Sequence, residues 1–137
     1  MMEIHVITAL PELLDSPLNT SMMKRAQQHA AVSFLVHDLR RYGLGKHQQI
    51  DDYPYGGGAG MILKPEPIFD CVQDVQEKYH LHDCPLIYLS PAGAVFDQKK
   101  ATELSFRKKL FLLCGHYKGI DERVREELVA EEISIGD

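Results

Sequence analysis

Short apolar runs alternate with helical patterns along this chain, and this alternation restricts the fold more than any other feature. Strand-like runs occupy residues 3–10, 32–36, 85–90, 109–114 and 132–135. Helical patterns occupy residues 18–30, 67–79, 97–105 and 121–129. Asp97 and Asp121 have the side chain expected of an N-cap. Strands that alternate with helices indicate a parallel sheet with helices on both faces, so we predict an α/β fold. The turn-forming sequence 91–93 predicts a sharp end to the third strand.

The length and composition fit a single cytoplasmic domain. The chain has 137 residues, 45% of them hydrophobic, which is enough for a buried core. The N-terminus lacks the pattern of a signal peptide, and the apolar runs are too short to span a membrane. Three widely spaced cysteines argue against a disulfide framework and favour a reduced compartment. The segment 80–84 has metal-ligand residue types but no partner cluster, so we expect no metal site.

The charge distribution leaves nucleic-acid binding open. A net charge of −5 argues mildly against it, because phosphate contacts need Lys and Arg. Basic residues nevertheless cluster at 24–25, 40–41, 99–100 and 107–109. Such clusters bind phosphates locally or are simply solvated surface.

Three loops with glycine follow predicted strands, at residues 88–93, 114–121 and 133–137. Ligands of parallel sheets bind outside the carboxyl ends of the strands, and glycine lets a ligand approach the backbone. One such loop is most simply a turn, whereas three at successive strand ends favour a shared pocket. Neither G-x-G-x-x-G nor a P-loop is present, so a cofactor held by backbone groups fits better than one held by its phosphates.

The long loop 41–60 is the second unusual feature. Its end, Tyr-Pro-Tyr-Gly-Gly-Gly-Ala-Gly at 53–60, is unsuited to a helix or central strand. It could form a lid or a wall against a flat ring, with Asp51 and Asp52 accepting hydrogen bonds from a base edge. The alternative is a surface turn.

Taken together, the motifs at 51–61, 88–91, 114–123 and 134–137 resemble the bacterial tRNA (guanine-N1)-methyltransferase family, TrmD, of the SPOUT knotted methyltransferases. The match runs in order over almost the whole chain. The resemblance implies methyl transfer from S-adenosylmethionine to N1 of the guanine 3′ of the anticodon in tRNA. It also implies a trefoil knot around the cofactor and a homodimer with active sites at the subunit interface.

The resemblance also assigns site residues. Those implied for the cofactor are Tyr88, Leu89, Ser90, Pro91, Gly93, Gly115, Tyr117, Gly119, Ser134, Ile135 and Gly136. Those implied for the target guanine are Asp51, Tyr55, Gly57, Gly58 and Gly60.

Two departures from the family pattern affect the expected activity. Lys118 stands where many members carry a glutamate. The family's aspartate base, the end of its knot and its tRNA-binding C-terminal domain would all lie beyond Asp137. We therefore expect residues 1–137 to be an N-terminal cofactor domain with an incomplete knot, inactive alone and prone to self-association through exposed apolar surface. The alternative is a non-catalytic module that binds S-adenosylmethionine or RNA, or that dimerises.

Overall fold

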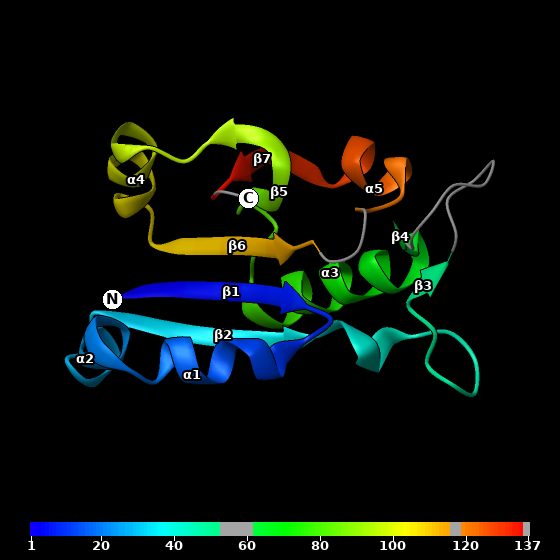
Figure 1. The fold of residues 1–137 in the computed structure, drawn as a ribbon, viewed down its shortest axis with the longest axis horizontal. Helices are drawn as coiled ribbons and strands as arrows, with labels where there is room; N and C mark the ends of the chain where they lie inside the picture. Colours follow the sequence, from blue (N-terminus) through cyan, green and yellow to red (C-terminus); the bar gives the residue numbers. More distant parts are fainter. Residues whose placement is uncertain (53–61, 116–118, 136–137) are drawn as a thin grey trace.

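The fold is built on one parallel sheet of five strands, as the sequence predicts. The computed structural model describes residues 1–52, 62–115 and 119–135. The strand order is β2-β1-β6-β5-β7, and every neighbouring pair is parallel (Figure 1). The strands are β1 (Met2–Thr8), β2 (Val32–Asp38), β5 (Leu86–Val95), β6 (Lys109–Cys114) and β7 (Val129–Ser134).

Helices cover both faces of this sheet, because its strands bury alternate residues on opposite sides. Phe111 and Leu113 of β6 belong to the core cluster that includes α3 (Pro65–Tyr79) and Val124 of α5 (Glu122–Glu127). Leu110 of β6 belongs to a second cluster with Leu104 of α4 (Gln98–Ser105). The two layers thus make β6 a fully covered central strand.

Two N-caps predicted from sequence are confirmed. The Asp97 carboxylate accepts a hydrogen bond from the Lys100 amide at 2.8 Å, where α4 begins. The Asp121 carboxylate accepts one from the Arg123 amide at 2.9 Å, where α5 begins. Both caps satisfy amides that the first turn of a helix leaves without a partner.

The predicted helix 18–30 is confirmed over residues 21–28, but it is shorter than predicted, because the chain ends one short helix and begins a second here. A 3₁₀ turn, η1 (Pro11–Leu14), leads into α1 (Asp15–Leu18), and α2 (Ser21–Gln28) follows. The side chains of Asn19 and Thr20 donate hydrogen bonds to the carbonyls of Asp15 and Ser16, at 2.7 and 3.0 Å. These bonds satisfy the carbonyls of α1 and end it, as short polar side chains often do.

The predicted stop after Ser90 is also wrong, since β5 continues to Val95. Its ladder with β7 is interrupted instead: Leu89 and Ala94 both pair with Ile133, so residues 90–93 form an extended bulge. The bulge accommodates Pro91, which has no amide hydrogen for the ladder.

The last predicted helix is too long. It ends at Glu127, and β7 begins at Val129, three residues before the predicted strand. Pairing of residues 129–131 with Leu86 and Ile87 of β5 accounts for the difference.

The long loop 41–60 is partly ordered by a small antiparallel ladder. A 3₁₀ turn, η2 (Leu39–Tyr42), precedes it, and β3 (Asp51–Asp52) pairs with β4 (Ile62–Leu63). All three cysteines are free thiols. Among the described residues, no helix has the length and apolar character needed to cross a membrane.

Candidate functional site

The described parts of the three glycine loops converge at one end of the sheet. β5 lies between β6 and β7, and Leu89 pairs with Cys114 on one side and Ile133 on the other. The residues that follow these three are Ser90, Gly115 and Ser134. The structure thus brings together one predicted cofactor residue from each loop. In the sequence these residues lie up to 44 positions apart, from 90 to 134.

Tyr88 lies beneath these loops and explains the glycine at 115, whereas the backbone conformation explains the glycine at 119. Its side chain is buried, with 2% of the residue exposed. A Cβ atom on Gly115 would lie 2.8 Å from both Cε1 and Oη of Tyr88. Gly119 has a φ of 140°, a conformation that residues with side chains rarely adopt. The fold itself therefore requires glycine at 115 and 119.

The phenol of Tyr88 remains protonated at neutral pH. Burial raises its pKa, and the neighbouring carboxylate of Glu132 acts in the same direction, against the guanidinium of Arg125. That guanidinium lies 5.7 Å from the centre of the Tyr88 ring, within the range of a cation–π contact. Tyr88 is consequently a neutral, packed support for the loops and is poorly suited to act as a base.

The bulge of β5 is held against β7. A Cβ atom on Gly93 would lie 2.5 Å from the carbonyl carbon of Glu132 and from the amide nitrogen of Ile133, so the two backbones are in direct contact. The Ser90 hydroxyl donates a hydrogen bond to Glu132 Oε2 at 2.7 Å and accepts one from the Ala92 amide at 3.2 Å. Pro91, at the tip, is exposed.

Sequence reasoning missed Glu132 and Arg125. Arg125 donates from Nε to Glu132 Oε1 at 2.8 Å and from Nη1 to Glu122 at 2.8 Å. The only sequence signal was an acidic residue beside the apolar end of a predicted strand. That signal does not identify the partner, because Ser90 is 42 positions away.

The third loop begins beside the end of β5. Ser134 is buried, and its carbonyl accepts a hydrogen bond from the Phe96 amide at 2.8 Å. Ile135, the next residue, is 71% exposed. This predicted cofactor segment therefore leaves the sheet after Ser134 with an exposed apolar residue, Ile135.

The base of the long loop is joined to the second glycine loop. Leu63, which pairs with Asp51, donates its amide to the Gly119 carbonyl at 3.0 Å and accepts from the Asp121 amide at 3.3 Å. Asp51, predicted to contact the substrate, is therefore attached through Leu63 to the loop predicted to contact the cofactor. Tyr55, Gly57, Gly58, Gly60, Tyr117, Lys118 and Gly136 lie outside the described residues.

Acidic partners neutralise part of the basic clusters. Glu131 accepts from Lys100 at 2.7 Å and from Arg107 at 3.3 Å, and Arg40 pairs with Asp38 at 3.1 Å. Within the described segments, no three Asp, Glu, His or Cys side chains are grouped closely enough to hold a metal ion.

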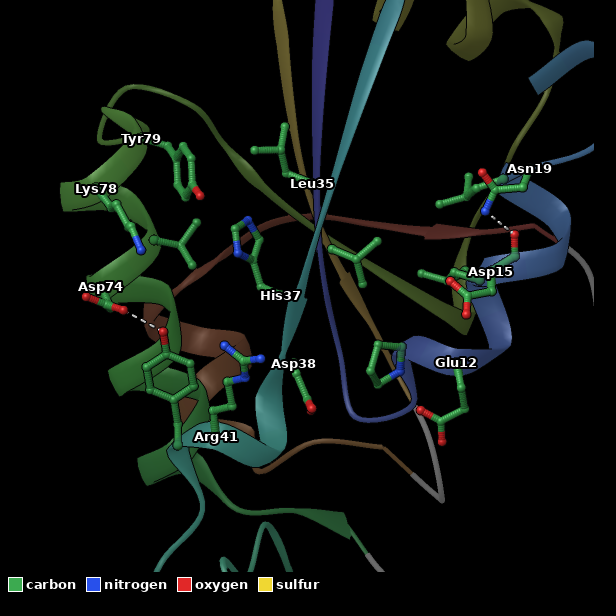
Figure 2. Close-up of a pocket in the computed structure, with 16 residues that line it drawn as sticks. Glu12, Asp15, Asn19, Leu35, His37, Asp38, Arg41, Asp74, Lys78 and Tyr79 are labelled. Carbon is green, nitrogen blue, oxygen red and sulfur yellow. Dashed lines mark hydrogen bonds between the residues drawn. The ribbon is translucent and has the colours of Figure 1, made fainter. Parts of the chain in front are cut away.

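A separate groove of about 650 Å³ lies at the opposite edge of the sheet, along β2. Figure 2 shows its two walls on opposite sides of β2: Asp74 and Lys78 come from α3, and Asp15 comes from α1. His37 of β2 lies between β2 and α3. Of the predicted cofactor and substrate residues that the structure describes, none lines this groove.

Comparison with known proteins gives one consistent result. The family model described as tRNA (Guanine-1)-methyltransferase TrmD matches residues 2–137. The tRNA (guanine-N(1)-)-methyltransferases of Alkaliphilus metalliredigens and Bacillus subtilis are 47% and 48% identical over 99% of this chain. The chain spans 56% of the length of each. The crystal structure of tRNA (m1G37) methyltransferase from Aquifex aeolicus superposes with a TM-score of 0.86 at 35% identity, covering 99% of this chain and 60% of that one.

Proposed function

The chain belongs to the tRNA (guanine-1)-methyltransferase TrmD family, and we propose that it forms the S-adenosylmethionine-binding part of such an enzyme. The reaction we propose for the whole protein is methylation of N1 of the guanine 3′ of the anticodon in tRNA. We further propose that it acts as a cytoplasmic homodimer and that its strand-end loops belong to the trefoil knot of the family.

One observation carries the cofactor proposal: Leu89 of β5, next to the buried Tyr88, pairs with Cys114 at the end of β6 and with Ile133 near the end of β7. The sequence contains no phosphate-binding loop, and strand ends offer backbone donors and acceptors. Adenine, ribose hydroxyls and an amino acid group all bind well to such backbone groups. Residues suited to contact them are Leu89, Ser90 and Gly115, with Ser134 and Ile135 on the third loop.

The chemistry demands little of these residues beyond positioning. S-adenosylmethionine supplies an activated methyl group on a sulfonium. The protein must then align that group with the guanine and remove the N1 proton. An enzyme that acts on a base must also take it out of its stack. The ladder that attaches Asp51 to the Gly119 loop supports a target guanine beside the cofactor.

Calorimetry with S-adenosylmethionine and S-adenosylhomocysteine tests the proposal directly. We expect one site per chain, and we expect Gly115→Trp to abolish binding because an indole cannot fit beside Tyr88. Ala130→Trp, at an exposed position of β7, is the matched control and should bind as the wild type does. A folded wild-type chain that binds neither ligand would refute the proposal and favour a non-catalytic RNA-binding or dimerisation module.

A further inference from the structure

The bulge of β5, residues 90–93, interrupts the pairing of β5 with β7, so other contacts must hold it in place. Residues 90–93 lie between two segments that both pair with Ile133, so they have no register partner of their own in β7. Pro91 and Ala92 are exposed, which means that packing contributes little to their order. The described side-chain hydrogen bond from this bulge to the rest of the sheet is the one from Ser90 to Glu132.

Glu132 uses its two carboxylate oxygens for different partners. Oε2 accepts from Ser90 at 2.7 Å, and Oε1 accepts from Arg125 Nε at 2.8 Å. Arg125 in turn holds Glu122 and lies over the Tyr88 ring. One carboxylate thus joins the first glycine loop, helix α5 and the buried tyrosine beneath the site.

The environment keeps Glu132 charged. Burial raises its pKa, but the hydrogen bonds from Arg125 and Ser90 outweigh that effect and hold the pKa below its ordinary value. A charged carboxylate accepts stronger hydrogen bonds than a neutral amide, so a glutamine cannot replace it fully.

We propose that Glu132 is a positioning residue of the cofactor site: through Ser90 it fixes the bulge 90–93, and through Arg125 it holds Tyr88, the support beneath the loops. This inference rests on the proposed function for its ligand. Glu132 acts through Ser90 and Arg125 and need not touch the cofactor itself.

The test compares Glu132→Gln with Glu131→Gln in the 137-residue chain. Glu131, its neighbour in β7, binds Lys100 and Arg107 instead, so it controls for loss of an ion pair in the same strand. We expect S-adenosylhomocysteine to bind Glu132→Gln about tenfold more weakly, a loss of about 1.4 kcal/mol. We expect Glu131→Gln to bind it with unchanged affinity. Amide hydrogen exchange should accelerate at residues 90–95 in Glu132→Gln and not in Glu131→Gln.

Ser90 variants keep the proposal testable if Glu132→Gln does not fold. Ser90→Ala removes the same hydrogen bond, whereas Ser90→Thr keeps a hydroxyl and should restore the exchange protection. When Ser90→Ala and Glu132→Gln are combined, the double variant should bind little more weakly than Glu132→Gln alone, because both changes act on the one contact between Ser90 and Glu132.

The outcomes separate this inference from the proposed function. Wild-type affinity and exchange in Glu132→Gln, or additive effects in the double variant, would overturn the positioning role. A wild-type chain that binds no ligand would refute the proposed function, while the exchange comparison would still decide whether Glu132 orders the bulge.

Discussion

Nδ1 of His5 lies 3.0 Å from Nε2 of His37, across the pair of strands β1 and β2. The other nitrogen of His5, Nε2, lies 3.1 Å from a carboxylate oxygen of Glu3. A carboxylate only accepts, so His5 donates from Nε2 to Glu3, and its other ring nitrogen shares a hydrogen bond with His37. A proton added to His37 therefore enters next to a fully buried histidine ring.

The first prediction is that stability falls as the pH drops from about 6.5 to 4. Burial, with help from His5 and Lys78 and against Asp74, lowers the pKa of His37 from 6.5 to about 4. The unfolded chain therefore binds more protons than the folded chain in this pH window, so the free energy of unfolding decreases as the pH falls. Partial exposure of the ring screens the effect, and we expect a loss of about 1–2 kcal/mol.

Urea unfolding at several pH values checks this prediction. His37→Gln should show a clearly weaker pH dependence than the wild type between pH values of about 4 and 6.5. His82→Gln, at an exposed position, is the matched control and should retain the wild-type slope. Equal slopes in wild type and His37→Gln would show that His37 is not responsible.

The second prediction concerns the ion-pair network between α4 and β7. Hydrogen bonding from Lys100, opposed by burial and assisted by Arg107, holds the pKa of Glu131 below its ordinary value. Its contribution is therefore complete above a pH of about 4.5 and is lost as the pH falls through the folded pKa. Glu131→Gln should destabilise the chain by about 0.5–1 kcal/mol at neutral pH, because water reaches the network. Denaturation in about 1 M salt should show a smaller difference, and a salt-independent effect would contradict this explanation.

The third prediction is that Gly115→Ala destabilises the fold even when no ligand is present. The added methyl would lie 2.8 Å from Cε1 and from Oη of the buried Tyr88, so the tyrosine side chain or the loop must move. Overpacking of this kind costs about 1–3 kcal/mol. Tyr88→Phe removes Oη but leaves Cε1, and should therefore reduce the penalty only partly. Thermal melts of the wild type, the two single variants and the double variant measure these differences in stability. A Gly115→Ala chain as stable as the wild type would mean that the contact relaxes freely.

Local signals in the sequence predicted much of this fold. Asp97 and Asp121 were recognised as N-caps because a cap depends only on the next two or three residues. The alternation of strands and helices predicted the parallel sheet for the same reason. The sequence also indicates the glycine loops, as turns or as places where a ligand approaches the backbone. The packing of Gly115 on Tyr88 adds a structural requirement at one of them.

The features that sequence reasoning missed depend on partners far along the chain. β5 continues past Pro91 because β7 offers Ile133 to both Leu89 and Ala94. Glu132 gains its role from Ser90, 42 positions earlier, and no local pattern connects the two. The break between α1 and α2 is an exception: it depends on two side chains that bond to carbonyls only four positions earlier, and these local bonds compete with a helical pattern.

The last prediction is that the chain self-associates through the edge of the sheet next to the candidate site. Val95 and Ile135 are 77% and 71% exposed, and the hydrogen bond from the Phe96 amide to the Ser134 carbonyl holds their two segments together. Exposed apolar side chains gathered at one edge favour association, since burying them removes apolar surface from water. Sedimentation over a range of concentrations should show a dimer that the combined change Val95→Lys and Ile135→Lys weakens by about tenfold or more. Met22→Lys is the matched control: Met22 is 72% exposed but lies on α2, which packs near β2 at the opposite edge, so this change should leave the association intact. A wild-type chain that stays monomeric at high concentration, or a Met22→Lys variant that dissociates as readily as the double variant, would show that this edge does not hold two copies together.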